Sequence, residues 1–193
     1  MISITRSLLA AALLVVAAPL AADTVEDYSE TVGKFQSNDT AAPYFNSAYG
    51  YAVLPTIGKG GVGIGGARGK GQVYVGGDVT GFVTMTQLSI GLQLGGQSYS
   101  QVIFFEDQRA YDDFTNGNFE FDAQASAVAI TASAQASAGT QGTGASSGAG
   151  GTAGVQAVTD YYKGMKVFTI AKGGLMYQAA IAGQKYKFKP LED

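Results

Sequence analysis

The stretch that decides the fold is Ala48-Tyr-Gly-Tyr-Ala-Val-Leu-Pro-Thr-Ile-Gly-Lys-Gly-Gly-Val-Gly-Ile-Gly-Gly-Ala-Arg-Gly-Lys-Gly-Gln-Val-Tyr-Val75. Short apolar runs alternate there with glycines and with three cations, Lys59, Arg68 and Lys70. Glycine adopts positive φ angles without steric cost, so it is common where a chain reverses direction. The pattern therefore predicts β-strands joined by tight glycine turns, with the cations at or near those turns.

Strand patterns fill this stretch and most of the chain after it. Leu88, Ile90, Leu92 and Leu94 alternate with other residues at a period of two, which is typical of a strand with one buried face. The expected strands are Gly50–Thr56, Gly61–Arg68, Gln72–Gly76, Phe82–Leu94, Ser98–Phe105, Phe119–Asp122, Val167–Ala171, Leu175–Ile181 and Lys185–Phe188.

Short helical patterns interrupt the strands. An apolar stripe at helical spacing predicts a first helix, and Pro43 suits the first position of a short second one. Asp107 is expected to cap a third helix, which Gly117 ends. The fold class is therefore α+β: a β-rich, mainly antiparallel twisted sheet or barrel-like core with short helices packed on it. The stripe of the first helix is Val25, Tyr28, Val32 and Phe35, and the inward side of the third is Ala110, Tyr111 and Phe114.

The composition excludes several kinds of chemistry. The chain has no cysteine, histidine or tryptophan, which excludes thiol nucleophiles, Ser-His triads and ordinary zinc sites. No cofactor or metal is expected. With 12 Lys+Arg against 15 Asp+Glu, the net charge of −3 argues against nucleic-acid binding, which needs a cationic footprint. We interpret the carboxylate pairs Glu106/Asp107, Asp112/Asp113 and Glu120/Asp122 as a helix cap and solvated faces.

A glycine motif near the centre imitates a nucleotide-binding loop. Residues 58–63 and 61–66 both fit G-x-G-x-x-G. A dinucleotide site requires this turn to open a helix that receives the pyrophosphate. Strand-forming residues follow here instead, so nucleotide binding is not predicted.

Two segments that are poor in charged residues bear on localisation and organisation. Arg6, the apolar run Leu8–Ala18 and the small residues before position 23 are typical of a secretory signal peptide over residues 1–22. We expect an exported protein, periplasmic or secreted and peripherally membrane-associated, with one domain over residues 23–193.

Residues 139–154 are nearly all Gly, Ala, Ser and Thr and predict a flexible loop, or else a contact element that orders on a membrane or partner.

The last strand carries a regular charge pattern. Lys185, Lys187 and Lys189 alternate with Tyr186 and Phe188, so the lysines should share one face and the aromatic rings the other. One interpretation is a solvated edge strand that lysines protect from aggregation. The other is a cationic ridge for lipid headgroups, which the three cations of the glycine stretch would join if they lie nearby. The candidate lipid-binding residues are Lys59, Arg68, Lys70, Lys185, Lys187 and Lys189.

Four blocks of the chain resemble the SYLF family, also called the Ysc84-type actin-binding or lipid-binding domain. The motifs that carry the resemblance are Ala-Tyr-Gly-Tyr-Ala-Val-Leu-Pro, Gly-Gly-Val-Gly-Ile-Gly-Gly, Phe-Phe-Glu-Asp-Gln-Arg-Ala-Tyr-Asp-Asp-Phe and Gly-Leu-Met-Tyr-Gln-Ala-Ala-Ile-Ala-Gly-Gln-Lys-Tyr. They lie within Ala48–Val75, Gly91–Phe121 and Gly164–Phe188, and a polar strand pattern at Gln124–Ala138 completes the set.

The resemblance implies a compact β-rich domain without catalytic activity. Eukaryotic members of the family bind phosphoinositides or other anionic lipids, and some bind and bundle actin. For an exported bacterial member, the implied partner is an anionic phospholipid or membrane surface, and actin is not expected. The alternative is a protein-interaction or envelope-structural module that uses residues 139–154 for docking.

Overall fold

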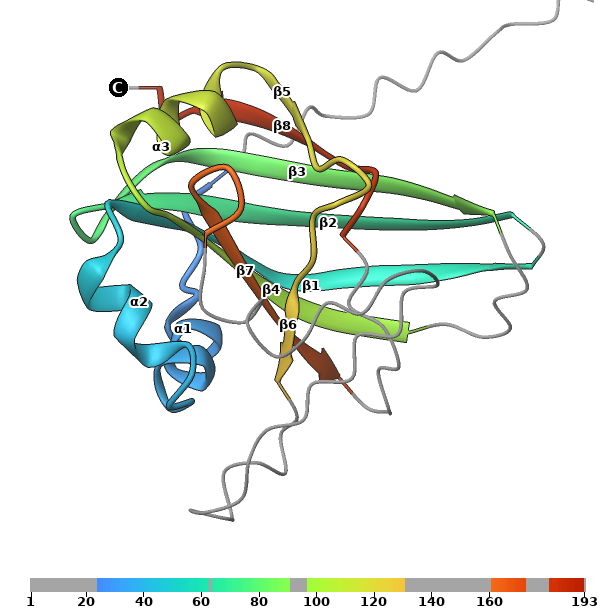
Figure 1. Cartoon of the computed structure of the whole chain (residues 1–193), viewed down its shortest axis with the longest axis horizontal. Coiled ribbons are helices and arrows are strands. Elements are labelled where there is room, and N and C mark those ends of the chain that lie inside the picture. The colour runs from blue at the N-terminus through green and yellow to red at the C-terminus, as the bar shows by residue number, and fades with distance from the viewer. Residues whose placement is uncertain (1–23, 63, 91–96, 131–160, 173–180, 193) are drawn as a thin grey trace, which may run out of the picture.

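A computed structural model describes residues 24–62, 64–90, 97–130, 161–172 and 181–192. Over these ranges the strands form one open sheet in the order β5-β8-β3-β2-β1-β4-β7-β6, antiparallel except for β6 and β7 (Figure 1). The α+β, β-rich and mainly antiparallel fold class is therefore confirmed. The elements are α1 Ser29–Gln36, α2 Ala42–Ser47, β1 Gly50–Val62, β2 Ile64–Val75, β3 Asp78–Ile90, β4 Gln97–Phe105, α3 Gln108–Thr115, β5 Asn118–Glu120, β6 Val128–Ile130, β7 Met165–Lys172 and β8 Gln184–Pro190.

The glycine stretch forms two long strands, not the three shorter ones that its sequence predicted. β1 and β2 pair antiparallel along their lengths, with one irregularity between Val53 and Thr56. A Cβ atom on Gly71 would lie 2.2 Å from the carbonyl oxygen of Val53. That glycine is therefore needed because two backbones approach closely, and not because the chain turns there. The chain reverses later, at Gly76 and Gly77, whose φ angles are +62° and +96°.

The first helix is shorter than its apolar stripe predicted. α1 begins at Ser29, whose backbone N–H donates to the Asp27 carboxylate over 2.9 Å. Val25 lies before the helix and is 54% exposed, so its placement on the buried stripe is wrong. Phe35 is fully buried, as predicted. Asp27 lies outside the helix and satisfies the backbone N–H of its first residue, and this local bond accounts for the later start.

The third helix follows the prediction closely. The Asp107 carboxylate accepts a hydrogen bond of 2.8 Å from the backbone N–H of Ala110 at the start of α3. Gly117 has a φ angle of +118° just beyond the end of the helix. Ala110 and Phe114 are fully buried. The cap and stop residues therefore set this helix from the sequence alone.

The sheet curls around an interior, and we call the face toward this interior the inner face. Nε2 of Gln101 on β4 donates to Oε1 of Gln184 on β8 over 3.0 Å. In a flat sheet these strands, four positions apart, would be about 19 Å apart. The curl therefore brings their inner side chains together. Phe114 of α3 and Tyr186 of β8 fill this interior, with ring centroids 5.1 Å apart.

The opposite side, which we call the outer face, carries a second core beneath α1 and α2. Phe35 of α1 and Phe45 of α2 pack with Val53, Phe104 and Phe168, which come from β1, β4 and β7. Figure 1 shows α1 and α2 together, away from α3. The two helices thus cover one part of the outer face, over the β1, β4 and β7 side of the sheet.

Several sequence predictions concern residues outside the ranges that the structure describes. The predicted signal peptide, the loop at 139–154 and positions 175–180 of a predicted strand lie outside the described residues. Within the described ranges, no helix is both long and apolar enough to cross a membrane.

Candidate functional site

A row of side chains crosses three neighbouring strands of the outer face. Lys70 on β2 is the register partner of Thr84 on β3, and Thr84 is the register partner of Lys187 on β8. Residues directly opposite each other in a sheet share a face, and adjacent strands lie about 4.8 Å apart. Lys70 and Lys187 therefore lie on one face, about 10 Å apart at their Cα atoms.

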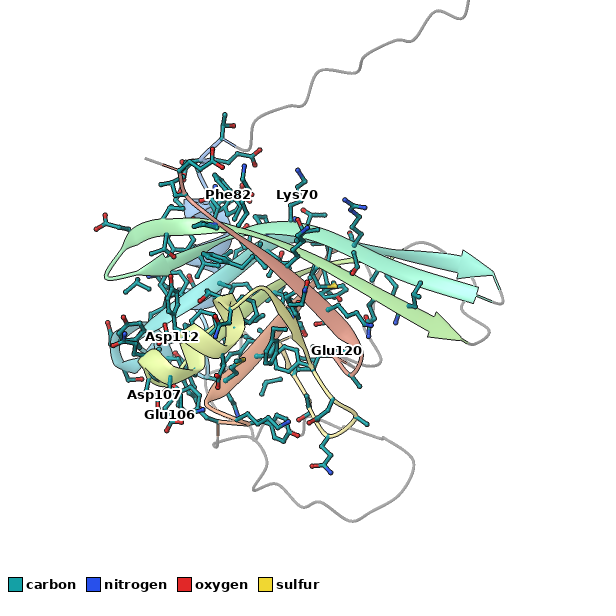
Figure 2. All side chains as sticks on the ribbon, turned by 90° about the horizontal axis from the view of Figure 1, so that it is seen from above. Lys70, Phe82, Glu106, Asp107, Asp112 and Glu120 are labelled. Carbon is teal, nitrogen blue, oxygen red and sulfur yellow. The ribbon has the colours of Figure 1, made fainter. Side chains whose placement is uncertain are left out.

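A parallel row lies two residues along the strands. Arg68 on β2 faces Thr86 on β3, which faces Lys185 on β8. Lys189 continues the set and pairs with Phe82, which Figure 2 shows on the same side of the sheet as Lys70. All the cations of these rows are exposed. We call the set of Arg68, Lys70, Lys185, Lys187 and Lys189 the cationic face.

Lys59 does not belong to the cationic face, which corrects its place among the candidate residues. Its register partner is Ala67, a residue of the inner core, and Ile57, two positions earlier on β1, is also in that core. Side chains alternate between the two faces of a strand. Lys59 therefore projects on the inner side, away from Arg68 and Lys70.

A further cation, Lys172 at the end of β7, joins the outer face. Its Nζ donates to Oγ1 of Thr56 over 2.8 Å. Thr56 is the register partner of Lys70. No pattern in the sequence links Lys172 to the other cations, because only the pairing of distant strands brings it to this face.

The lysines of β8 do not simply protect a sheet edge. β5 pairs with β8 through Asn118 opposite Lys187 and Glu120 opposite Lys185. β8 is therefore the second strand from the edge, and the edge-protection interpretation is wrong for this paired part. Tyr186 between the two lysines is buried on the inner face, as the alternation predicted.

Two lysines of the cationic face form weak ion pairs. Nζ of Lys185 lies 3.4 Å from Oε2 of Glu120, and Nζ of Lys189 lies 3.7 Å from Oε1 of Glu192. All four side chains are half or more exposed. Solvent-exposed pairs of this kind contribute about 0–1 kcal/mol, so an external anion can compete for both lysines.

Acidic side chains gather on the other side of the molecule. Figure 2 shows Glu106, Asp107 and Asp112 at α3, across the sheet from Lys70 and Phe82. All three acids are exposed, which confirms their interpretation as a cap and a solvated face. The outer face also has acids, since Glu120 and Glu192 pair with its lysines and Nε2 of Gln72 donates to the carbonyl oxygen of Glu26 over 3.2 Å.

A separate acidic residue anchors the turn before β7. Oδ2 of Asp122 accepts hydrogen bonds of 2.7 Å from Lys163 Nζ and from the Tyr162 hydroxyl. The bond from Lys163, followed by that from Tyr162, lowers the pKa of Asp122 to about 2. Asp122 is therefore more than the solvated acid that its sequence predicted. Among the described residues, no group of three or more potential ligands is placed to hold a metal ion.

The chain is similar to known proteins over most of its length. A family model described as "Ysc84: Las17-binding protein actin regulator" matches residues 86–188. A protein of Aeromonas veronii named "Beta cell expansion factor A" is 27% identical over 178 residues. That alignment covers 88% of this chain but 56% of the relative, so the chain spans little more than half of the relative's length. Because the family model matches more than half of the chain, the chain belongs to the Ysc84-type, or SYLF, family.

Proposed function

We propose that the protein binds anionic phospholipid headgroups through its cationic face, without catalysis. The observation that carries the proposal is the strand register, which places Arg68 and Lys70 with the three lysines of β8 on one exposed face. A basic residue near an anionic membrane contributes about 1 kcal/mol of attraction. Several such residues on one rigid sheet act together, since the sheet holds them at fixed spacing.

Two further features support a peripheral mode of binding. The acids of α3 lie on the other side of the sheet, so their charges face away from a membrane that contacts the cationic face. Phe82 lies between Lys189 and Gln72 in the register of the outer face and is half-buried. An apolar ring beside a lysine can insert at the boundary between headgroups and acyl chains while the ammonium group stays at the headgroups.

Vesicle flotation tests this function. Phosphatidylcholine vesicles with and without phosphatidylglycerol are mixed with the protein at low and high salt. We expect flotation only with phosphatidylglycerol, and less of it at high salt, because salt screens exposed charges. Replacing Lys185, Lys187 and Lys189 by Gln should weaken binding about a hundredfold at low salt, at about 1 kcal/mol per lysine.

The matched control replaces Lys59, Arg109 and Lys163 by Gln. It removes the same charge from residues that lie outside the cationic face. Binding should stay within about threefold of the original, since these charges act from farther away. An equal loss in both triple variants would show that net charge alone governs binding, and the cationic face would be rejected.

A protein partner is the second candidate, because the matching family model is described as a Las17-binding actin regulator. An acidic protein surface would meet the same cations. Absence of flotation on every vesicle, together with crosslinking of a protein through Lys187, would favour this candidate. Residues 139–154, the other predicted docking element, would be deleted in the same experiment.

A further inference from the structure

One end of the cationic face forms a groove of about 610 Å³. Arg68, Thr86, Leu88, Glu120 and Lys185 are among the residues that line it. The groove thus contains both signs of charge, a hydroxyl group and an apolar side chain. A site for a simple anion would not require the carboxylate.

The polar groups of this groove stand in one row. Arg68 faces Thr86, Thr86 faces Lys185, and Lys185 faces Glu120, on the consecutive strands β2, β3, β8 and β5. Neighbouring members are therefore about 4.8 Å apart at their backbones. The order along the row is guanidinium, hydroxyl, ammonium and carboxylate.

Glycines leave space beside this row. Gly58 faces Arg68 across β1 and β2, and Gly66 faces Leu88 across β2 and β3. No atom lies within 4 Å of a Cβ atom built on Gly58. Leu88 is 86% exposed at the same end of the groove. A ligand can therefore approach the backbone there and place an apolar part against Leu88.

The charges in the row select the class of ligand. A phosphate group between Arg68 and Lys185 can accept hydrogen bonds from both and from the Thr86 hydroxyl. Oε2 of Glu120 lies 3.4 Å from Nζ of Lys185, so the Glu120 carboxylate would repel a ligand that carries only negative charge. A ligand that also carries a primary ammonium group can donate to the Glu120 carboxylate and remove this repulsion. A trimethylammonium group has no N–H to donate.

We propose that the groove binds the phosphoethanolamine headgroup of a membrane lipid and prefers it to phosphocholine. This inference rests on the proposed lipid-binding function and adds a headgroup preference to it. The cationic face as a whole would attract the protein to an anionic membrane. The row from Arg68 to Glu120 would then hold a zwitterionic headgroup within that membrane.

The first experiment uses soluble headgroups. Amide chemical shifts of the ¹⁵N-labelled protein are followed by NMR during titration with O-phosphoethanolamine, phosphocholine and inorganic phosphate. We expect saturable shifts at Arg68, Thr86 and Lys185, with O-phosphoethanolamine about threefold tighter than phosphocholine, the size of one exposed ion pair. Equal affinities for all three probes would overturn the preference.

A matched pair of variants tests the role of Glu120. Glu120→Gln and Asp112→Asn each remove one negative charge, but Asp112 lies on α3, across the sheet (Figure 2). Glu120→Gln should remove the preference for O-phosphoethanolamine, and Asp112→Asn should keep it. A preference that survives in Glu120→Gln would overturn the assignment of the ammonium to Glu120.

The second experiment uses vesicles with a fixed fraction of phosphatidylglycerol, in which phosphatidylethanolamine replaces phosphatidylcholine. Tighter binding that depends on Glu120 supports the inference. Binding to phosphatidylglycerol without any gain from phosphatidylethanolamine overturns the inference and leaves the proposed function standing. Soluble-headgroup binding without any flotation removes the proposed function, and with it the membrane lipid as the source of the headgroup.

Discussion

Lys59 and Arg68 lie one register position apart in the β1–β2 hairpin but on opposite faces of the sheet. Arg68 is the partner of Gly58, and Lys59 is the partner of Ala67. The two cations are close in the sequence and in the sheet. The alternation of side chains nevertheless sends them to different environments, because the period of a strand is two residues.

This relationship gives a prediction with single variants. Lys187→Gln should weaken binding to phosphatidylglycerol vesicles about fivefold at low salt, and Lys59→Gln should change it less than twofold, since one interfacial lysine contributes about 1 kcal/mol. Vesicle flotation at several lipid concentrations gives both affinities. Equal losses would mean that the face on which a lysine lies does not matter.

The contact between Gly71 and β1 predicts a stability change. A Cβ atom on Gly71 would lie 2.2 Å from the Val53 carbonyl oxygen and 2.8 Å from Cγ of Leu54. Backbone must move to admit it, so Gly71→Ala should lower the free energy of unfolding by about 1–3 kcal/mol. Gly60→Ala is the control, because no atom lies within 4 Å of its added Cβ, and it should stay within about 0.5 kcal/mol. Urea unfolding measures both, and equal effects would contradict the close-approach explanation.

The buried amide of Gln184 predicts a second stability change. It accepts from Gln101 over 3.0 Å and from the Tyr186 hydroxyl, and its Nε2 donates to the Tyr99 hydroxyl over 2.9 Å. Gln184→Ala removes hydrogen-bond partners from these buried groups. Each buried group left unsatisfied lowers the free energy of unfolding by about 1–3 kcal/mol. We expect a loss of at least about 2 kcal/mol in urea unfolding. Gln36→Ala, at an exposed position of α1, should change stability by less than about 0.5 kcal/mol. A small loss in Gln184→Ala would show that water replaces the amide.

The carboxylate of Asp122 predicts a pH dependence below pH 4. Its pKa falls from the ordinary value of 3.8 to about 2 in the folded protein, chiefly through the hydrogen bond from Lys163. A lowered folded-state pKa stabilises the protein above pH 3.8, and this contribution is lost as the pH falls toward 2. Asp122→Asn should therefore flatten the dependence of stability on pH in this window. Unfolding measured at several pH values tests this, and an unchanged slope in Asp122→Asn would assign the dependence to other carboxylates.

Much of the local structure could be predicted because short-range chemistry sets it. The Asp107 cap and the stop at Gly117 define α3 through bonds and φ angles within a few residues. The alternation of lysines with Tyr186 likewise assigns the two faces of β8 without knowledge of its neighbours. Glycine was the exception, because the sequence does not distinguish a glycine that turns the chain from one that a neighbouring backbone approaches, such as Gly71.

The sequence by itself determined the fold class, the family resemblance and the alternation within each strand, since these depend on local pattern and composition. Only the tertiary structure decided which strands pair and in what register. That register joins Arg68 to Lys185 through Thr86, excludes Lys59 and adds Lys172 and Glu120 to the outer face. The physical reason is that pairing between strands distant in the chain depends on packing over the whole sheet, which places on one surface residues that no local pattern connects.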